Sequence, residues 1–189
     1  FHLFRYNALK YTVTSTPMKN NNLKLAIDSY KDFPQEGIIF RDILPILRDP
    51  EIFSDLIKEM SNSNILKNSD AIIAIDARGF IFGAAISYHL FKPLVVARKP
   101  GKLPGEIISK SYNLEYGSNS LSIQEKSLCD YQTFFIIDDL LATGGTVKCV
   151  EDILNSKGKK ISGLSVVIEL KDLNAKSKFS FPVESQVIY

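Results

Sequence analysis

Two adjacent aspartates, Asp138 and Asp139, follow the apolar run TFFII and precede the turn Thr143-Gly144-Gly145-Thr146. A glycine-rich turn between a strand and a helix presents backbone N–H groups that bind an anion at the helix N-terminus. The spacing is not that of a nucleotide P-loop, and no G-x-G-x-x-G follows a strand, so a triphosphate or dinucleotide site is disfavoured. The turn therefore predicts a site for one phosphate group, and a plain helix start with a threonine cap is the alternative.

The carboxylate pair restricts which phosphate compound fits this turn. Ionised aspartates only accept hydrogen bonds, so they repel an anion unless hydroxyl groups or cations lie between them. A ribose 5-phosphate satisfies both features, because its phosphate binds the turn while its vicinal diol donates to Asp138 and Asp139. We therefore expect a sugar phosphate as the ligand.

Two other segments carry charge at the ends of apolar runs. One is Asp76-Ala77-Arg78-Gly79, and the other runs from Arg98 through Lys99 to Lys102. Ligands of open parallel sheets sit beyond the carboxyl ends of the strands. We expect all three segments to meet at one edge of a sheet, although a surface salt bridge or a solvated basic face would also explain the cations.

Apolar runs alternate with helical patterns along the chain, which indicates an α/β fold with a central, mostly parallel sheet flanked by helices. Between residues 99 and 128 the pattern becomes polar and contains glycine, which predicts an inserted antiparallel hairpin. The stretch 32–47 is interrupted by Pro34, Gly37 and Pro45, so we expect it to be irregular or only briefly extended. Strands are predicted at about 71–76, 93–98, 133–138 and 161–170, and helices at about 23–30, 50–60, 80–90 and 146–155, with a loop over 61–70.

Composition indicates one ordinary globular domain. The chain has 189 residues, of which 45% are hydrophobic and 23% charged, and its net charge is +2. The charges are interspersed, so they predict no nucleic-acid partner, and no apolar run reaches the length of a membrane span. The two cysteines, Cys129 and Cys149, are too few for a disulfide framework, which favours a cytoplasmic location. The first 17 residues fit the rest poorly, and we interpret them as an extension that is disordered, artificial or a transit peptide.

The stretch DDLLATGGT after an apolar strand resembles the phosphoribosyl pyrophosphate (PRPP) motif of the type I phosphoribosyltransferase family, in the form typical of its adenine-specific members. The segments FPQEGIIFRDILPIL, DARGFIFGAAI, RKPGKLPGEIISKSYNLEYG and VIEL agree with that family in order and spacing. The resemblance covers the chain from about residue 23 to its last residue.

This resemblance implies a single domain over residues 18–189, with a hood over the base at about 31–47 and a mobile loop at about 99–120. It implies a purine-salvage reaction in which adenine and PRPP give AMP and pyrophosphate through an oxocarbenium-like state. It also implies Mg²⁺, carried mainly by PRPP oxygens and water rather than by direct protein ligands, and a homodimer.

The resemblance also implies roles for individual residues. Glu115 is the candidate for proton transfer and Arg78 for stabilising the departing pyrophosphate, although a surface glutamate remains the alternative for Glu115. The ribose-phosphate group is assigned to Asp138, Asp139, Ala142, Thr143, Gly144, Gly145 and Thr146. The pyrophosphate is assigned to Ala77, Arg78, Gly79, Arg98, Lys99, Lys102 and Tyr116, and adenine to Ile39, Phe40, Arg41 and Leu140.

Two other functions are weighed against this one. A salvage transferase for hypoxanthine or xanthine would share the PRPP turn but need a different hood, and the segment FPQEGIIFRD argues against it. A PRPP-sensing regulator that binds nucleic acid would need an added basic face or DNA-binding segment. Neither alternative accounts for as many of the motifs.

Overall fold

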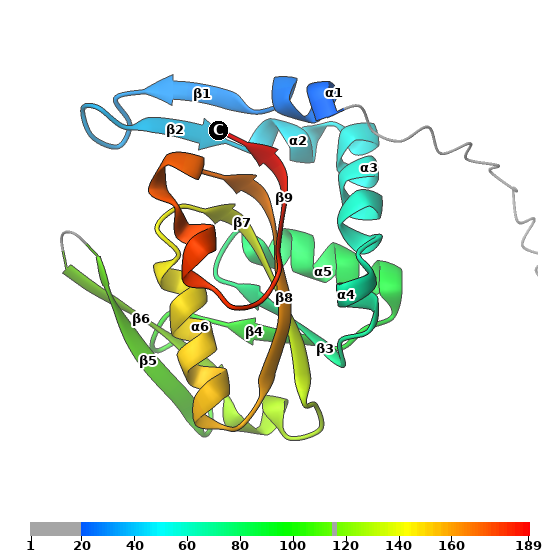
Figure 1. Cartoon of the computed structure of the whole chain (residues 1–189), viewed down its shortest axis with the longest axis vertical. Coiled ribbons are helices and arrows are strands. Elements are labelled where there is room, and N and C mark those ends of the chain that lie inside the picture. Colours follow the sequence, from blue (N-terminus) through cyan, green and yellow to red (C-terminus); the bar gives the residue numbers. More distant parts are fainter. Residues whose placement is uncertain (1–19, 115–116) are drawn as a thin grey trace, which may run out of the picture.

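The computed structural model describes residues 20–114 and 117–189. Its centre is a five-stranded sheet in the order β4-β3-β7-β8-β9, in which every neighbouring pair is parallel (Figure 1). These strands are β3 (Ala71–Ile75), β4 (Leu94–Ala97), β7 (Thr133–Leu141), β8 (Lys160–Glu169) and β9 (Val183–Ile188). The predicted parallel α/β fold is therefore confirmed.

Alternate residues of the buried strands face two separate cores, as expected when a sheet is covered on both sides. Ile73 of β3 and Ile136 of β7 belong to the core beneath α6 (Gly145–Ser156). Ile72 and Phe135 belong to the core on the other face. That second face is covered by α1 (Asn20–Leu25), α2 (Leu44–Arg48), α3 (Pro50–Ser61), α4 (Asn64–Lys67) and α5 (Gly79–Leu90).

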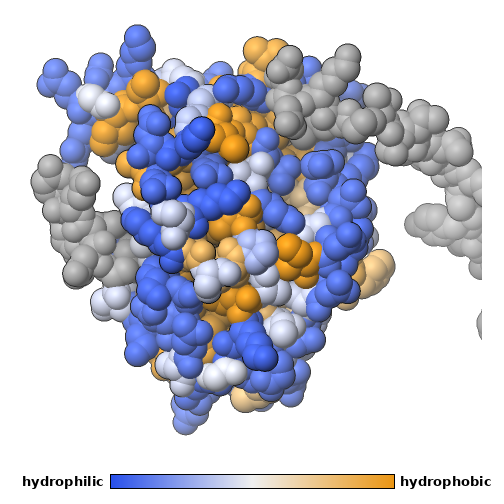
Figure 2. All heavy atoms as spheres, viewed as in Figure 1, coloured by the Kyte–Doolittle hydropathy of each residue, from blue (hydrophilic) through white to orange (hydrophobic). Residues whose placement is uncertain are grey.

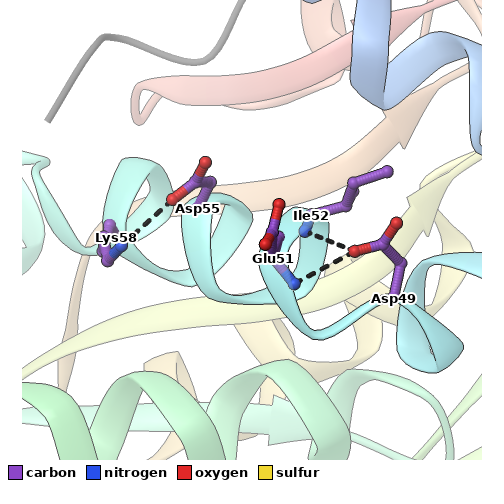
Figure 3. A network of polar contacts seen from close by, with 5 residues as sticks. All are labelled: Asp49, Glu51, Ile52, Asp55 and Lys58. Carbon is purple, nitrogen blue, oxygen red and sulfur yellow. Dashed lines mark hydrogen bonds and ion pairs between the residues drawn. The ribbon is translucent and has the colours of Figure 1, made fainter. Parts of the chain in front are cut away.

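Helix α3 begins where the sequence predicts. Asp49 is its N-cap, and the side-chain Oδ1 of Asp49 accepts hydrogen bonds from the backbone N–H groups of Glu51 and Ile52, each at 3.0 Å (Figure 3). Pro50 occupies the first turn, where its missing N–H is not needed. One turn further, Lys58 pairs with Asp55 on the exposed face.

The hood region is more ordered than the sequence predicts. Strands β1 (Asp28–Lys31) and β2 (Ile39–Asp42) form an antiparallel hairpin, so the helix predicted at 23–30 is wrong beyond Leu25. Pro45 does not break structure there, because it lies in the first turn of α2. Large side chains stay exposed on this hairpin, namely those of Tyr30, Phe33, Ile38 and Ile39. Figure 2 shows hydrophobic surface in this part of the molecule.

The inserted hairpin is confirmed in the part of the chain that the structure describes. It consists of β5 (Ile107–Leu114) and β6 (Gly117–Gln124), and it joins β4 through a bridge between Arg98 and Ser122. Short 3-10 helices follow at Glu125–Leu128, Lys171–Leu173 and Ala175–Lys178. Within the described residues, no helix combines the length and apolar character needed to cross a membrane.

Candidate active site

The carboxyl ends of β3 and β7 border a cavity of about 290 Å³. This cavity brings together two of the three charged segments predicted to meet at one edge. Its wall is formed by Asp76, Ala77, Arg78, Asp138, Asp139, Leu140, Ala142, Thr143, Gly144, Gly145 and Thr146. Every residue predicted to hold the ribose phosphate therefore lines one space.

Asp138 and Asp139 are buried inside strand β7, with 5% and 8% of their surfaces exposed. The backbone N–H of Asp139 donates to Asp138 Oδ1 at 2.9 Å. Burial, followed by the neighbouring Asp139 carboxylate, raises the pKa of Asp138 well above its ordinary value. A ligand that donates a hydrogen bond to Asp138 would therefore offset the penalty on its ionised form.

Arg78 is the cation closest to this pair. Its Nε lies 2.7 Å from Asp139 Oδ2, and Arg78 itself is the N-cap residue of α5. The next residue, Gly79, leaves no room for a side chain, because a Cβ there would lie 2.8 Å from Asp138 Oδ1. The start of α5 therefore fixes where both carboxylates sit.

The turn before α6 has the geometry of an anion cradle. Its N-cap is Gly144, with φ at +83°, and no side chain caps the helix, so the predicted alternative of a threonine cap is not what forms. A residue that the sequence did not single out supports the turn: Lys178 donates to the carbonyl oxygen of Thr143 at 2.9 Å. The ring of Phe179 lies against Gly144, at 3.0 Å from the position of a Cβ.

The second cationic segment reaches the cavity through Asp76, to which the sequence assigned no role. Asp76 Oδ2 accepts from Arg98 Nε at 3.3 Å and from the backbone N–H of Lys99 at 3.4 Å. Arg98 also donates to the carbonyl oxygen of Lys102 at 3.4 Å. These three cationic residues are not part of the cavity wall, and Asp76 links them to it. The sequence signal for this link was the carboxylate of Asp76, which ends one predicted strand next to Arg78, while Arg98 ends the next predicted strand.

The hood lies next to Arg78. The Phe40 ring is 5.6 Å from Arg78 Cζ, which places Phe40 beside the cavity. Leu140 forms part of the cavity wall, whereas Ile39 is half exposed on the hairpin. The Arg41 side chain contacts the Tyr189 ring and is not part of the cavity wall.

Glu115 and Tyr116, predicted to act in proton transfer and pyrophosphate binding, lie outside the described residues. The proton-transfer role therefore stays a prediction. The same holds for the N-terminal segment over residues 1–17.

Comparison with known proteins agrees with this geometry. Residues 46–182 match the model of the phosphoribosyl transferase domain family. An adenine phosphoribosyltransferase of Prochlorococcus marinus (strain MIT 9211) is 59% identical over 172 residues, which cover 91% of this chain and 100% of the relative. One from Mycoplasmopsis synoviae (strain 53) is 45% identical over 169 residues, covering 88% of this chain and 99% of the relative.

Solved structures give the same result. Adenine phosphoribosyltransferase from Thermoanaerobacter pseudethanolicus superposes with a TM-score of 0.86 at 37% identity, covering 90% of this chain and 100% of that one. The Saccharomyces cerevisiae enzyme, solved with adenine and an imino-altritol bisphosphate, gives a TM-score of 0.83 at 34% identity and covers 89% and 98%.

Proposed function

Because the chain belongs to the adenine phosphoribosyltransferase family of type I phosphoribosyltransferases, we propose that its cavity holds PRPP and that adenine binds beside it under the hood. The enzyme acts in purine salvage and converts adenine and PRPP to AMP and pyrophosphate. The observation that carries the proposed arrangement is the shared cavity of the buried carboxylate pair and the uncapped Gly144 turn.

The 5-phosphate binds the backbone N–H groups of residues 143–146 at the start of α6. The ribose diol donates hydrogen bonds to Asp138 and Asp139. These two buried carboxylates thereby gain donors that an anion without hydroxyl groups could not supply. Burial and mutual repulsion already disfavour charge on Asp138, and the sugar hydroxyls relieve this by hydrogen bonding.

The pyrophosphate leaves toward the cations at the carboxyl ends of β3 and β4. Arg78 exchanges its partner Asp139 for the departing oxygens, while the diol takes over that carboxylate. Arg98 and Lys99, held in place by Asp76, extend the same positive surface, and Lys102 continues it. As the C1–oxygen bond to pyrophosphate breaks, the bond from adenine N9 to C1 forms and N9 loses its proton. Charge-assisted hydrogen bonds that strengthen as charge develops on the leaving group lower the barrier.

Mg²⁺ fits this site as a cation carried by the substrate. The carboxylate oxygens of Asp138 and Asp139 would accept hydrogen bonds from the water shell of a hard cation, whose direct ligands would be PRPP oxygens and water. Held in this way, Mg²⁺ would neutralise charge on the pyrophosphate.

Adenine lies under the hood, between Phe40 and Leu140, where backbone groups of Ile39 and Arg41 face its polar edge. Selection between adenine and hypoxanthine follows from that polar edge, because a 6-amino group donates where a 6-oxo group accepts. Glu115 is the proposed acceptor of the N9 proton.

The assay that tests this function measures nucleotide formation from PRPP and Mg²⁺ with adenine, hypoxanthine, guanine, xanthine and orotate in parallel. We expect product with adenine alone, and absence of AMP would refute the function. Glu115→Leu is expected to lower kcat more than it raises the KM for PRPP. Near-normal turnover in that variant would remove Glu115 from the reaction.

A homodimer and a cytoplasmic location complete the proposal. Both cysteines are free, which fits a reducing compartment. Tyr88 and Phe91 are strongly exposed at the end of α5, and such aromatic surface is typical of protein interfaces. Sedimentation at several concentrations is expected to give a species of twice the 21.2 kDa chain mass.

A further inference from the structure

The hood needs support from the rest of the molecule. It is a two-stranded hairpin with several exposed apolar side chains, and isolated two-stranded hairpins are marginally stable in water. If the hood holds adenine, any contact that fixes its position also sets the affinity for the base.

Successive side chains of β2 point to opposite sides of the hairpin. Phe40 points toward Arg78 at the cavity. Arg41 points the other way, and its guanidinium Cζ lies 3.9 Å from the centre of the Tyr189 ring. The Nη1 of Arg41 also donates to Ser29 Oγ on β1 at 2.5 Å, so this one side chain joins both hood strands to Tyr189.

Tyr189 is in turn fixed to the sheet that carries the site. Its backbone N–H donates to the carbonyl oxygen of Glu169 at 3.0 Å, and its carbonyl oxygen accepts from Lys171 at 2.8 Å. Glu169 ends β8, whose neighbour β7 carries the aspartate pair. Figure 1 shows the end of β9 beside β2, as these contacts require. A continuous path therefore runs from β8 through Tyr189 and Arg41 to the hood.

We propose that Tyr189 is a positioning residue for the adenine pocket: its ring binds the Arg41 guanidinium and holds the hood at the distance from the sheet that the base requires. Lys24 of α1 lies 4.7 Å from the same ring, so Tyr189 fastens the preceding helix as well. The inference rests on the proposed placement of adenine under the hood.

The test compares Tyr189→Leu with the matched control Tyr189→Phe, which keeps the aromatic face that attracts the cation. In steady-state assays we expect Tyr189→Leu to raise the KM for adenine about fivefold while the KM for PRPP stays within twofold. Fivefold corresponds to ~1 kcal/mol, within the range of such contacts. Tyr189→Phe should retain the wild-type values. Only the KM for adenine should change, because the apparent affinity for adenine falls with the fraction of molecules in which the hood is correctly placed.

Hydrogen–deuterium exchange gives an independent measurement on the free protein. Exchange of the β2 amides should accelerate in Tyr189→Leu but not in Tyr189→Phe, while exchange in β7 stays unchanged. The double variant Arg41→Gln/Tyr189→Leu should be no weaker for adenine than the more affected single variant, because the two residues form one contact.

Two results would overturn the proposal: unchanged β2 exchange in Tyr189→Leu, or faster β2 exchange with an unchanged KM for adenine. Failure of the proposed function is recognised separately, since it would appear as absence of AMP formation by the wild-type enzyme.

Discussion

Gly79→Ala is expected to damage PRPP use by pushing a carboxylate out of place. A Cβ at position 79 would lie 2.8 Å from Asp138 Oδ1 and 3.0 Å from the carbonyl oxygen of Ile137. The first contact is about 0.6 Å shorter than the 3.4 Å at which ordinary van der Waals contact begins. Overpacking of this kind costs about 1–3 kcal/mol. The carboxylate or the start of α5 must shift, and displacement of reacting groups by about 1 Å can cost 10²-fold in rate.

Gly163→Ala is the matched control for this variant. A Cβ there would lie 2.7 Å from Cε2 of the buried Phe135 ring, so the steric overlap is comparable. Gly163 lies in β8 six residues before Glu169, the end of the strand nearest the site. This places Gly163 about 20 Å from that end. Both variants should lower Tm, by about 2–4 °C for each kcal/mol lost.

Only Gly79→Ala should lower kcat/KM for PRPP, by about ten- to a hundredfold. Thermal unfolding and initial-rate assays on the two variants decide the question. A Gly79→Ala enzyme with normal PRPP kinetics, or an equal kinetic loss in Gly163→Ala, would refute the steric reasoning.

Three further variants test other parts of the site. Asp138→Asn should lose PRPP use but be more stable than wild type above pH 3.8. Because the pKa of Asp138 is raised in the folded protein, this carboxyl group contributes most to the free energy of unfolding below pH 3.8 and less as pH rises, and asparagine carries no such penalty. Thermal unfolding measured against pH tests this. Asp76→Ala should lower kcat/KM for PRPP about tenfold and weaken inhibition by pyrophosphate, since Arg98 loses its partner; normal pyrophosphate inhibition would argue against that link. Lys178→Met should raise the KM for PRPP about three- to tenfold with the KM for adenine unchanged, and an equal effect in the exposed neighbour Lys176→Met would contradict the role of its bond to Thr143.

The sequence predicts the central sheet well because its signals are local. The run AIIAI gives β3 as a strand buried on both faces, and FFII does the same for β7. The loop predicted over 61–70 is wrong at Asn64–Lys67, which form the short helix α4, because the Ser63 side chain caps this helix by accepting a hydrogen bond from the backbone N–H of Leu66. Strand β9 was not predicted, since the polar residues at 184–186 interrupt its apolar pattern. Pairing with β8 and the burial of Val183 and Val187 stabilise it.

The site also combines features with a local sequence signal and features that depend on contacts between distant residues. The aspartate pair and the Gly-Gly turn adjoin in sequence, so their common cavity was predictable. Lys178 and Tyr189 act through contacts with residues 35 and 148 positions away, and no local pattern marks such partners.

The central claim is that the buried carboxylates of Asp138 and Asp139 bind the ribose diol, next to the turn at 143–146 that binds the 5-phosphate. Calorimetric titration of AMP and of 2′,3′-dideoxy-AMP into wild type and Asp139→Ala tests it, because comparing two ligands within each protein cancels the loss of the Arg78 ion pair. Hydrogen bonds to charged groups contribute about 1.5–3 kcal/mol each, so wild type should bind AMP about a hundredfold more tightly, and Asp139→Ala should discriminate far less. Equal affinity of wild type for both ligands, or undiminished discrimination in Asp139→Ala, would contradict the claim.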